Sequence, residues 1–475
     1  MSSILALWFL GMAILFSGGF FSKLGLSMLF CSLALWTYTM WLWARYPDKA
    51  LLKHFADDGN GAINQGLLAK PSKAVLLLLF SLQISLLCLW LLGFTQNEYS
   101  MQVLVVVTAI GAFVGTIWSL RSPCGWWLQL ALFGLLNVIL LLGVSDLRID
   151  ILIFQRDAAA ALLEGRNPYT LTYPNISEQG DASREYGPGI SINKRLQFGY
   201  VYLPLTLIAV IPGHLLGDFR FSYVAAVLLS ALFLFGWRLR GEKALLGALF
   251  LWSPLTILIH RGYTEYFVAA TLCFVLYCCL RQARWLPLAC GLFLASKQYA
   301  VLCLPLFWLL VPLWLQSKTS NSQEMQDDLT GAPREKLRGF LSFCLQALVI
   351  ASVVSLPMAL WNWDAFYYSS LKLQFLQPFR ADSLSFLALA KYWGWDQPPQ
   401  WFSFLLLTSA TAFVLKTNAS RCSSFFLSLA WVFFLFFSFS KQGMANYYYF
   451  VAVALTCAIV ARINEERTAS VHKNL

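Results

Sequence analysis

Long apolar runs separated by short polar connections dominate this sequence. A helix needs about 20 apolar residues to cross the hydrocarbon core of a bilayer, and backbone groups in that core must be satisfied internally, so runs of this kind predict helices. The predicted membrane spans are 4–22, 24–44, 75–94, 102–119, 125–144, 221–237, 244–259, 264–280, 285–296, 298–315, 340–360, 401–417, 423–440 and 447–463. The sequence therefore predicts an all-α fold, a polytopic bundle of about 14 transmembrane helices.

Two apolar stretches do not fit a simple span. Residues 200–217 contain Pro204 and Pro212, and we predict that they form a helix lying in the outer interface. Residues 285–315 are long enough for one span, but a single helix would hold Lys297 near mid-membrane, where a charge costs at least about 2.5–3.5 kcal/mol. We therefore predict two short helices with Lys297 at the outer turn between them.

The distribution of basic residues predicts the orientation of the bundle. With the split at Lys297, the connections 316–338, 416–421 and 462–475 lie on one side and hold nine Lys and Arg residues. The corresponding pieces on the other side hold four. Because cytoplasmic loops carry the excess of Lys and Arg, both termini are predicted to be cytoplasmic and the long polar loop 145–199 extracytoplasmic.

Composition narrows the class of protein further. Hydrophobic residues make up 59% of the 475 residues and charged residues only 12%, roughly half the charged fraction of a soluble domain. This excludes a soluble enzyme, a disordered chain and a nucleic-acid-binding module. The net charge of +11 is then interpreted as the charge of cytoplasmic loops. Most of the 11 cysteines lie in apolar runs, where they are expected to be small apolar side chains rather than a disulfide framework.

On the predicted topology, polar residues embedded in apolar surroundings gather on the outer side. In the loop 145–199, Asp150 precedes an apolar stretch, 151–163, that predicts an interfacial helix. Asp157 follows two helical turns later, which places both carboxylates on one helix face. A carboxylate at the membrane surface is a candidate general base, although a solvated loop acid or a helix N-terminal charge is the simpler interpretation.

Four further segments add candidate side chains on the same side. In the segment 260–267, Arg261 and Glu265 are spaced for an ion pair on one helix face, which a plain interfacial turn would also explain. Lys297 is a lone cation between apolar runs and could hold a phosphate, or could be a lysine whose amine reaches the interface. The remaining candidates in or near these segments are Gln298, Tyr299, Arg380, Asp382, Lys441, Gln442 and Asn446.

Several chemistries find no support in the sequence. No GxGxxG, Walker, HExxH or GxSxG motif stands in a suitable setting, so nucleotide-driven and zincin-type chemistry are not indicated. The carboxylates are too scattered to predict a metal site, and no cofactor is expected.

The order of these pieces resembles a known family. An Asp after a helix, followed by an apolar interfacial helix ending ALLEGRNPY, is similar to the first outer loop of GT-C-type glycosyltransferases. The segment VYLPLTLIAVIPGHLLGDFRF is similar to the second juxtamembrane helix of that family, with Leu203 where a proline is common. Four further pieces resemble bacterial mannosyltransferase-like members of the family: GYTEYF, LASKQYAVLCLP, QPFRADSLS and KQGMANYYYF.

The resemblance implies a domain organisation. It covers residues 125–463, with 145–220 as the outer catalytic loop and juxtamembrane helices. Residues 1–124 fall outside it and are expected to be accessory transmembrane helices, and 464–475 a cytoplasmic tail. The expected location is a bacterial plasma membrane with an extracytoplasmic active site.

The resemblance also implies an activity. The donor would be a sugar on a polyprenyl phosphate, with mannose as the sugar that the family suggests, and the acceptor a hydroxyl of a glycolipid, glycan or protein. Asp150 matches the position of the family's base, with Asp157 as second choice. The expected donor-phosphate ligands are Lys297 first, then Arg261, Arg380 and Lys441, and the expected sugar or acceptor ligands are Glu265, Gln298, Tyr299, Asp382, Gln442 and Asn446.

Three other functions stay open from the sequence. A transporter or lipid flippase would also carry charged residues in membrane segments, but it predicts inverted repeats that we do not find. A lipid-linked polysaccharide polymerase or ligase shares the donor chemistry. A non-enzymatic assembly subunit gives no reason for polar residues on one side.

Overall fold

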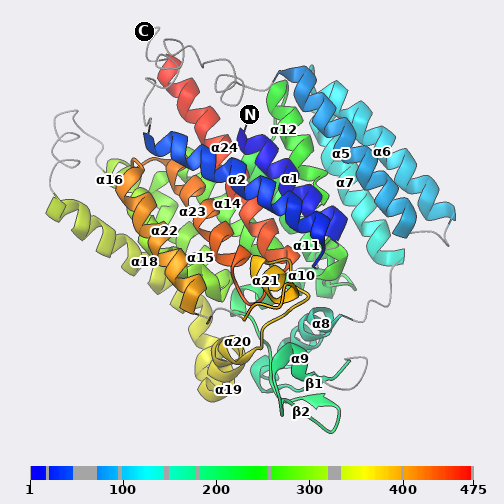
Figure 1. Cartoon of the computed structure of the whole chain (residues 1–475), viewed down its shortest axis with the longest axis vertical. Helices are drawn as coiled ribbons and strands as arrows, with labels where there is room; N and C mark the ends of the chain where they lie inside the picture. Colours follow the sequence, from blue (N-terminus) through cyan, green and yellow to red (C-terminus); the bar gives the residue numbers. More distant parts are fainter. Residues whose placement is uncertain are drawn as a thin grey trace.

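Helices account for most of the structure. The computed structural model describes residues 2–17, 21–45, 72–94, 99–143, 149–176, 182–254, 258–318, 333–396, 399 and 401–471. The long helices form one bundle, and the short helices and strands of two connecting segments gather at one end of it (Figure 1).

Each predicted span contains a helix. These are α1 Ser2–Ser17, α2 Lys23–Arg45, α5 Lys73–Phe94, α6 Tyr99–Ser119, α7 Pro123–Gly143, α11 Phe221–Phe235, α12 Glu242–Leu251, α14 Glu265–Arg281, α15 Leu286–Ser296, η4 Gln298–Leu309 followed by α16 Val311–Gln316, α18 Pro333–Trp361, α22 Trp401–Thr417, α23 Cys422–Ser438 and α24 Ala445–Val471. Five of them, α5, α6, α7, α18 and α24, are long and apolar enough to cross a bilayer by themselves. The α-helical membrane class is therefore supported, whereas the number of spans stays a prediction.

The N-terminal helices pack against the rest of the chain. The α1–α2 hairpin lies on α23 and α24, where the rings of Trp36 and Phe434 are 5.4 Å apart. Helices α5, α6 and α7 surround α12, and the Gln83 side-chain amide donates a 2.9 Å hydrogen bond to the Leu249 carbonyl. The helices of residues 1–124 thus pack directly against helices of the segment 125–463.

The prediction of two short helices meeting at Lys297 is confirmed. Lys297 has an extended backbone between α15 and η4. A short 3-10 helix before α15, η3 Ala283–Trp285, contacts α16, so the two arms fold back on each other. Gly291 of α15 allows close packing on α18, because a Cβ there would come within 2.6 Å of the Ala347 carbonyl.

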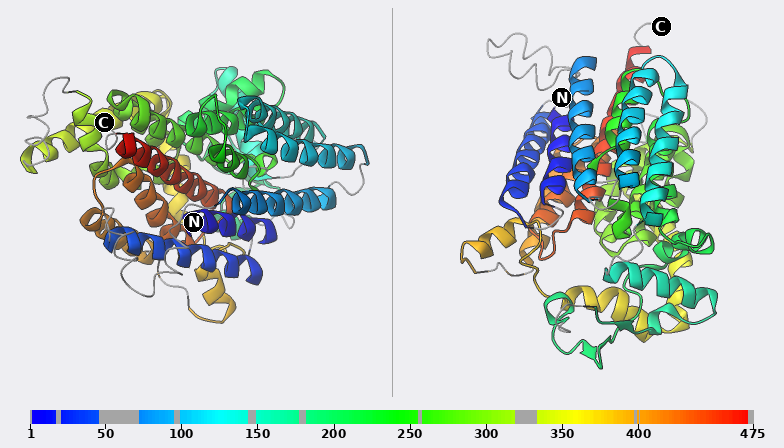
Figure 2. Two further views of the ribbon diagram at one scale, coloured as in Figure 1. Left: turned by 90° about the horizontal axis from the view of Figure 1, so that it is seen from above. Right: turned by 90° about the vertical axis from the view of Figure 1, so that its right-hand side faces the viewer.

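Basic residues from separate connections lie at one end of the bundle. Helix α1 begins and α24 ends at the same end, and α8, α9 and the strands lie at the other (Figures 1 and 2). At the first end, Lys243 donates to Asn464 over 3.5 Å and Lys336 donates to Ser420 over 3.0 Å. Lys243 contacts α24 directly, and the connection that holds Ser420 contacts α24 through the Ser423 amide, which donates to Glu465. We call this end of the bundle the basic end.

The connecting segment after α7 forms a small unit of its own. Its elements are α8 Asp150–Leu163, the 3-10 turn η1 Pro168–Thr170, β1 Tyr173–Pro174, α9 Ser183–Tyr186, β2 Ser191–Ile192, β3 Arg195–Leu196 and α10 Pro204–Leu215. The strands pair antiparallel in the order β1-β3-β2, with Leu196 opposite both Tyr173 and Ser191. Helix α8 was predicted at 151–163 and α10 within 200–217, and both are present; the sheet was not predicted.

A second connecting segment, 361–400, packs against this unit. It contains α19 Trp363–Tyr367, the π-helix η5 Tyr368–Lys372, α20 Leu373–Leu376 and α21 Phe386–Tyr392. The Gly199 amide donates a 2.9 Å hydrogen bond to the Ser369 hydroxyl, and the rings of Tyr169 and Phe366 are 4.9 Å apart. These contacts bring residues from distant parts of the chain to one end of the bundle.

Candidate functional site

Asp150 is the first residue of α8, where a negative charge is favourable beside the unpaired amides of the helix N-terminus. Its carboxylate accepts a hydrogen bond from the Tyr186 hydroxyl and one of 2.7 Å from the Ile151 amide. Burial and the negative charge of Asp150 hold the pKa of Tyr186 well above its usual value. The phenol therefore remains a donor that orients the carboxylate.

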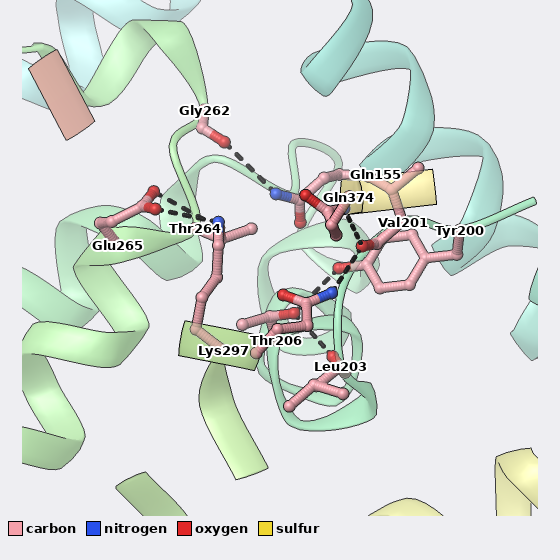
Figure 3. Close-up of polar contacts among 11 residues, drawn as sticks. Gln155, Tyr200, Val201, Leu203, Thr206, Gly262, Thr264, Glu265, Lys297 and Gln374 are labelled. Carbon is pink, nitrogen blue, oxygen red and sulfur yellow. Dashed lines mark hydrogen bonds and ion pairs between the residues drawn. The ribbon is translucent and has the colours of Figure 1, made fainter. Parts of the chain in front are cut away.

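The position of α8 is set by its contact with the loop before α14. The Gln155 side-chain amide donates to the Gly262 carbonyl over 3.3 Å (Figure 3). Gly262 has a φ of +68°, and a Cβ there would lie 2.3 Å from Leu152. The left-handed backbone favours glycine at this position, and the absence of a side chain lets Leu152 of α8 lie against it.

Glu265 and Lys297 form a buried ion pair beside this loop. The Lys297 amine lies 2.9 Å from a Glu265 carboxylate oxygen and donates a 2.6 Å hydrogen bond to the Thr264 hydroxyl (Figure 3). The two side chains are 6% and 1% exposed. Lys297 is thus already neutralised inside the protein, which weakens its expected role as the first phosphate ligand.

The charges of both Glu265 and Asp150 act on two tyrosines, Tyr202 and Tyr263. The Lys297 amine stands 4.1 Å from the centre of the Tyr202 ring, a cation–π arrangement. Burial raises the pKa of Tyr202 well above its usual value, and the negative charges of Glu265 and Asp150 raise it further. Burial likewise raises the pKa of Tyr263, with smaller contributions from the same two carboxylates. Asp150, Glu265 and Lys297 therefore belong to one electrostatic cluster. Together with Tyr186, Tyr202 and Tyr263 we call it the outer-end cluster, after the orientation that the sequence predicts.

The prediction that Arg261 and Glu265 lie on one helix face is wrong. Arg261 ends the 3-10 helix η2 Leu258–Arg261, and α14 begins only at Glu265. The left-handed Gly262 breaks the helix between them. Arg261 hydrogen-bonds the Tyr263 hydroxyl and lowers its pKa, opposing the effect of burial, so it lies beside the outer-end cluster.

Gln298 contacts backbone carbonyls and Tyr299 contacts aromatic rings, so both side chains stabilise the fold. The Gln298 side-chain amide donates 2.8 Å hydrogen bonds to the carbonyls of Val201 and Ser370, which ties the turn at Lys297 to both connecting segments. The Tyr299 ring lies 5.3 Å from that of Phe437. Its buried hydroxyl has no hydrogen-bond partner among the described residues.

Arg380 is paired within its own loop. Its guanidinium lies 2.7 Å from the Asp382 carboxylate and 4.0 Å from Glu185, in the helix that carries Tyr186. The hydrogen bond from Arg380 lowers the pKa of Asp382 below its usual value. Through Glu185, this loop contacts the outer-end cluster.

Among the described residues, the Lys441 amine contacts backbone carbonyls rather than a carboxylate. Its amine donates to the backbone carbonyls of Phe375 and Gln377, over 3.1 and 2.6 Å. The neighbouring Gln442 donates to the Pro378 carbonyl over 3.3 Å. Burial lowers the pKa of Lys441 to about 8. The loop between α23 and α24 thus supports residues 375–380.

Two predicted residues lie apart from these contacts. Asp157 pairs with its neighbour Arg156 at 2.9 Å, and both side chains are at least 36% exposed. Asn446 is buried in the first turn of α24. Within the described parts of the chain, no three His, Cys, Asp or Glu side chains are grouped to hold a metal ion.

The sequence did not single out the tyrosines that connect the cluster. Tyr186 lies 36 residues after Asp150, in a four-residue helix with no hydrophobic periodicity. Tyr202 lies two residues before α10, and only its place before Pro204 distinguishes it. No motif predicts either contact.

Comparison with known proteins adds no relative: no protein-family model, curated protein or solved structure matches the chain.

Proposed function

We propose that this protein is a membrane glycosyltransferase that moves a sugar from a polyprenyl-phosphate donor to an acceptor hydroxyl on the extracytoplasmic side. The observation that carries the proposal is the contact of Asp150 with Tyr186 beside Tyr202, Glu265 and Lys297. It gathers one oriented carboxylate and several hydroxyl groups at the end of an apolar bundle. A lipid-linked substrate reaches such a place laterally from the bilayer.

Asp150 serves as the general base in this mechanism. The acceptor hydroxyl transfers its proton to the carboxylate as its oxygen attacks the anomeric carbon. The bond from that carbon to the phosphate oxygen breaks in the same displacement, so the configuration inverts and polyprenyl phosphate leaves. The Tyr186 hydroxyl holds the carboxylate in the orientation that receives the proton.

The leaving phosphate needs a cation that is not already neutralised. Lys297 faces Glu265, and Arg380 faces Asp382. The Lys441 amine donates to two backbone carbonyls. We therefore assign donor-phosphate binding first to Lys441, keep Arg261 as a further candidate, and give Lys297 the role of positioning Tyr202.

Lys441 makes donor binding depend on pH. Its pKa of about 8 means that the ammonium form is present below pH 8 and is lost above it. The Michaelis constant for the donor is expected to rise about tenfold between pH 7 and pH 9, as the protonated fraction falls by that factor. Steady-state kinetics with a polyprenyl-phosphate sugar at each pH measures the rise.

Lys441→Arg is the matched control, because a guanidinium stays charged throughout this range. Its Michaelis constant is expected to change little with pH. An equal rise in the variant and the natural protein would remove Lys441 from donor binding.

The proposed sidedness is testable with single cysteines. Arg184 of α9 is exposed at the end that carries Asp150, and Ala419, between α22 and α23, is exposed near the basic end. In intact bacterial cells, a membrane-impermeant maleimide is expected to label Arg184→Cys, and to label Ala419→Cys only after permeabilisation. The natural protein gives the background, and the reverse pattern would contradict the proposed orientation.

Activity itself is tested with the purified full-length protein and a lipid-linked monosaccharide. Transfer of the sugar, with an inverted product, is the expected result. Transfer of a lipid-linked oligosaccharide but no monosaccharide would identify a polymerase or ligase instead. Donor movement across a vesicle membrane without sugar transfer would identify a flippase.

A further inference from the structure

Four exposed aromatic side chains lie where α21 ends and α22 begins, and we call them the aromatic patch. They are Tyr392, Trp393 and Trp395 at and just after the end of α21, and Trp401 at the start of α22. Each of them is at least 56% exposed. Large apolar side chains that gather on a protein surface mark a site of interaction. The aromatic patch is therefore a candidate interaction surface.

The opposite face of this segment fixes the aromatic patch to the bundle. The ring of Phe386, at the start of α21, lies 5.2 Å from that of Phe439, and the ring of Phe402 in α22 lies 6.1 Å from the same ring. Phe21, between α1 and α2, has its ring 5.5 Å from that of Tyr392. These contacts hold the patch beside the α1–α2 hairpin, where α21 projects sideways from the bundle (Figure 2).

The aromatic patch lies where two apolar helices begin. Helix α2 carries no charged residue from 24 to 44, and α22 carries none from 401 to 415. Leu24 and Phe404, near the starts of these helices, are 50% and 40% exposed. Helix faces of this kind fit the hydrocarbon core of a bilayer, which a helix of about 20 residues crosses. The patch therefore stands at the boundary between hydrocarbon and water, the level at which Trp and Tyr are enriched in membrane proteins.

Basic side chains adjoin the aromatic patch. The Lys23 amine stands 5.0 Å from the centre of the Tyr392 ring, and the neighbouring Lys391 is exposed. Asp396 is also exposed, so two of these three charges are positive. A lysine can lay its apolar stem along such a surface and hold its amine among lipid phosphates. The combination of exposed aromatic rings and lysines thus fits the headgroup layer of a bilayer.

We propose that the aromatic patch inserts into the headgroup layer of the leaflet at the end of the bundle with the outer-end cluster, with Lys23 and Lys391 facing lipid phosphates. The loop before α21 is bound to the loop of Lys441 by a 2.9 Å hydrogen bond from the Arg380 amide to the Lys441 carbonyl, so the inserted segment continues into the loop of the proposed phosphate ligand. The proposal gives the α1–α2 hairpin the role of positioning the patch, and it stands whether or not the protein transfers sugar.

Photolabelling of the natural protein at two depths tests this insertion. The full-length protein is placed in nanodiscs of phosphatidylcholine and phosphatidylglycerol that contain a phospholipid with a diazirine either in its headgroup or at the end of its acyl chain. Mass spectrometry is expected to find adducts of the headgroup probe at Trp393 and Trp395. The chain-end probe is expected to label Val353 of α18, which is 66% exposed, and neither probe is expected to label Ile192 of β2, which is 56% exposed.

Two outcomes would overturn the proposal. If neither probe labelled the aromatic patch, as expected for Ile192, the patch would face water or a protein partner. If only the chain-end probe labelled it, as expected for Val353, the patch would lie inside the hydrocarbon core.

Carboxylates introduced into the aromatic patch make the test specific. An anionic leaflet repels a carboxylate by about the 1 kcal/mol with which it attracts a lysine, which is equivalent to about a fivefold change in a binding equilibrium. Trp393→Asp/Trp395→Asp is therefore expected to lower the yield of headgroup adducts at Tyr392 by at least about fivefold. Ile192→Asp is the matched control at another exposed position and is expected to leave that yield unchanged. Equal yields in the two variants would contradict the insertion.

Discussion

Asp150→Asn is expected to lower the rate of sugar transfer by about 10²–10⁴-fold, the contribution that a positioned general base makes. The amide keeps the shape of the carboxylate and can still contact Tyr186, but it cannot take the acceptor proton. The loss is therefore expected in kcat, with little change in the Michaelis constant for the donor. Initial rates with purified protein measure it, and an unchanged melting temperature shows that the variant is folded.

Asp157→Asn is the matched control for this prediction. Asp157 lies two turns further along α8 and is paired with Arg156 at the surface. Its substitution is expected to leave the rate within about twofold, because a surface pair of this kind contributes little. If Asp157→Asn abolished transfer and Asp150→Asn did not, the base would have to be reassigned to the residue that the sequence left as second choice.

Lys297→Met is expected to destabilise the protein by about 3–5 kcal/mol, because it leaves Glu265 as a buried charge without its partner. Glu265→Gln leaves the Lys297 amine in the same condition and is expected to cost a similar amount. The double variant Lys297→Met/Glu265→Leu removes both charges and is expected to recover most of the loss. The free energy of unfolding in mixed micelles measures all three.

The exposed pair Arg462–Glu466 gives the control for burial. Its two charges are 3.1 Å apart on α24, and its side chains are 37% and 42% exposed. Glu466→Gln is expected to cost about 0.5 kcal/mol or less. If Lys297→Met cost no more than Glu466→Gln, the Glu265–Lys297 pair could not hold the turn and Tyr202 in place.

The helices could be predicted because their signals are local. The apolar run after Asp150 ends at Gly165 and Pro168, and the structure ends α8 at Leu163. The turn at Lys297 could be predicted because a lone charge inside a span is costly. The same cost requires that the buried Lys297 has a partner of opposite charge. Glu265, the first residue of α14, carries such a charge at the same predicted side, so this pair could have been found from the sequence.

The rest of the site depends on contacts between distant segments. Tyr186 contacts Asp150 only because three two-residue strands fold the loop back on α8. Strands this short leave no alternation in the sequence. Arg261 and Glu265 have helical spacing, but the left-handed Gly262 between them breaks the helix. Spacing alone therefore predicted a shared helix face that the structure does not have.

A structure of the protein in a nanodisc with a bound polyprenyl-phosphate sugar tests the central claim most directly. We expect the anomeric carbon within reach of an acceptor oxygen beside Asp150, and the phosphate within hydrogen-bond distance of Lys441 or Arg261. A glycolipid headgroup bound at the basic end of the bundle, beside Lys243 and Lys336, would contradict the account.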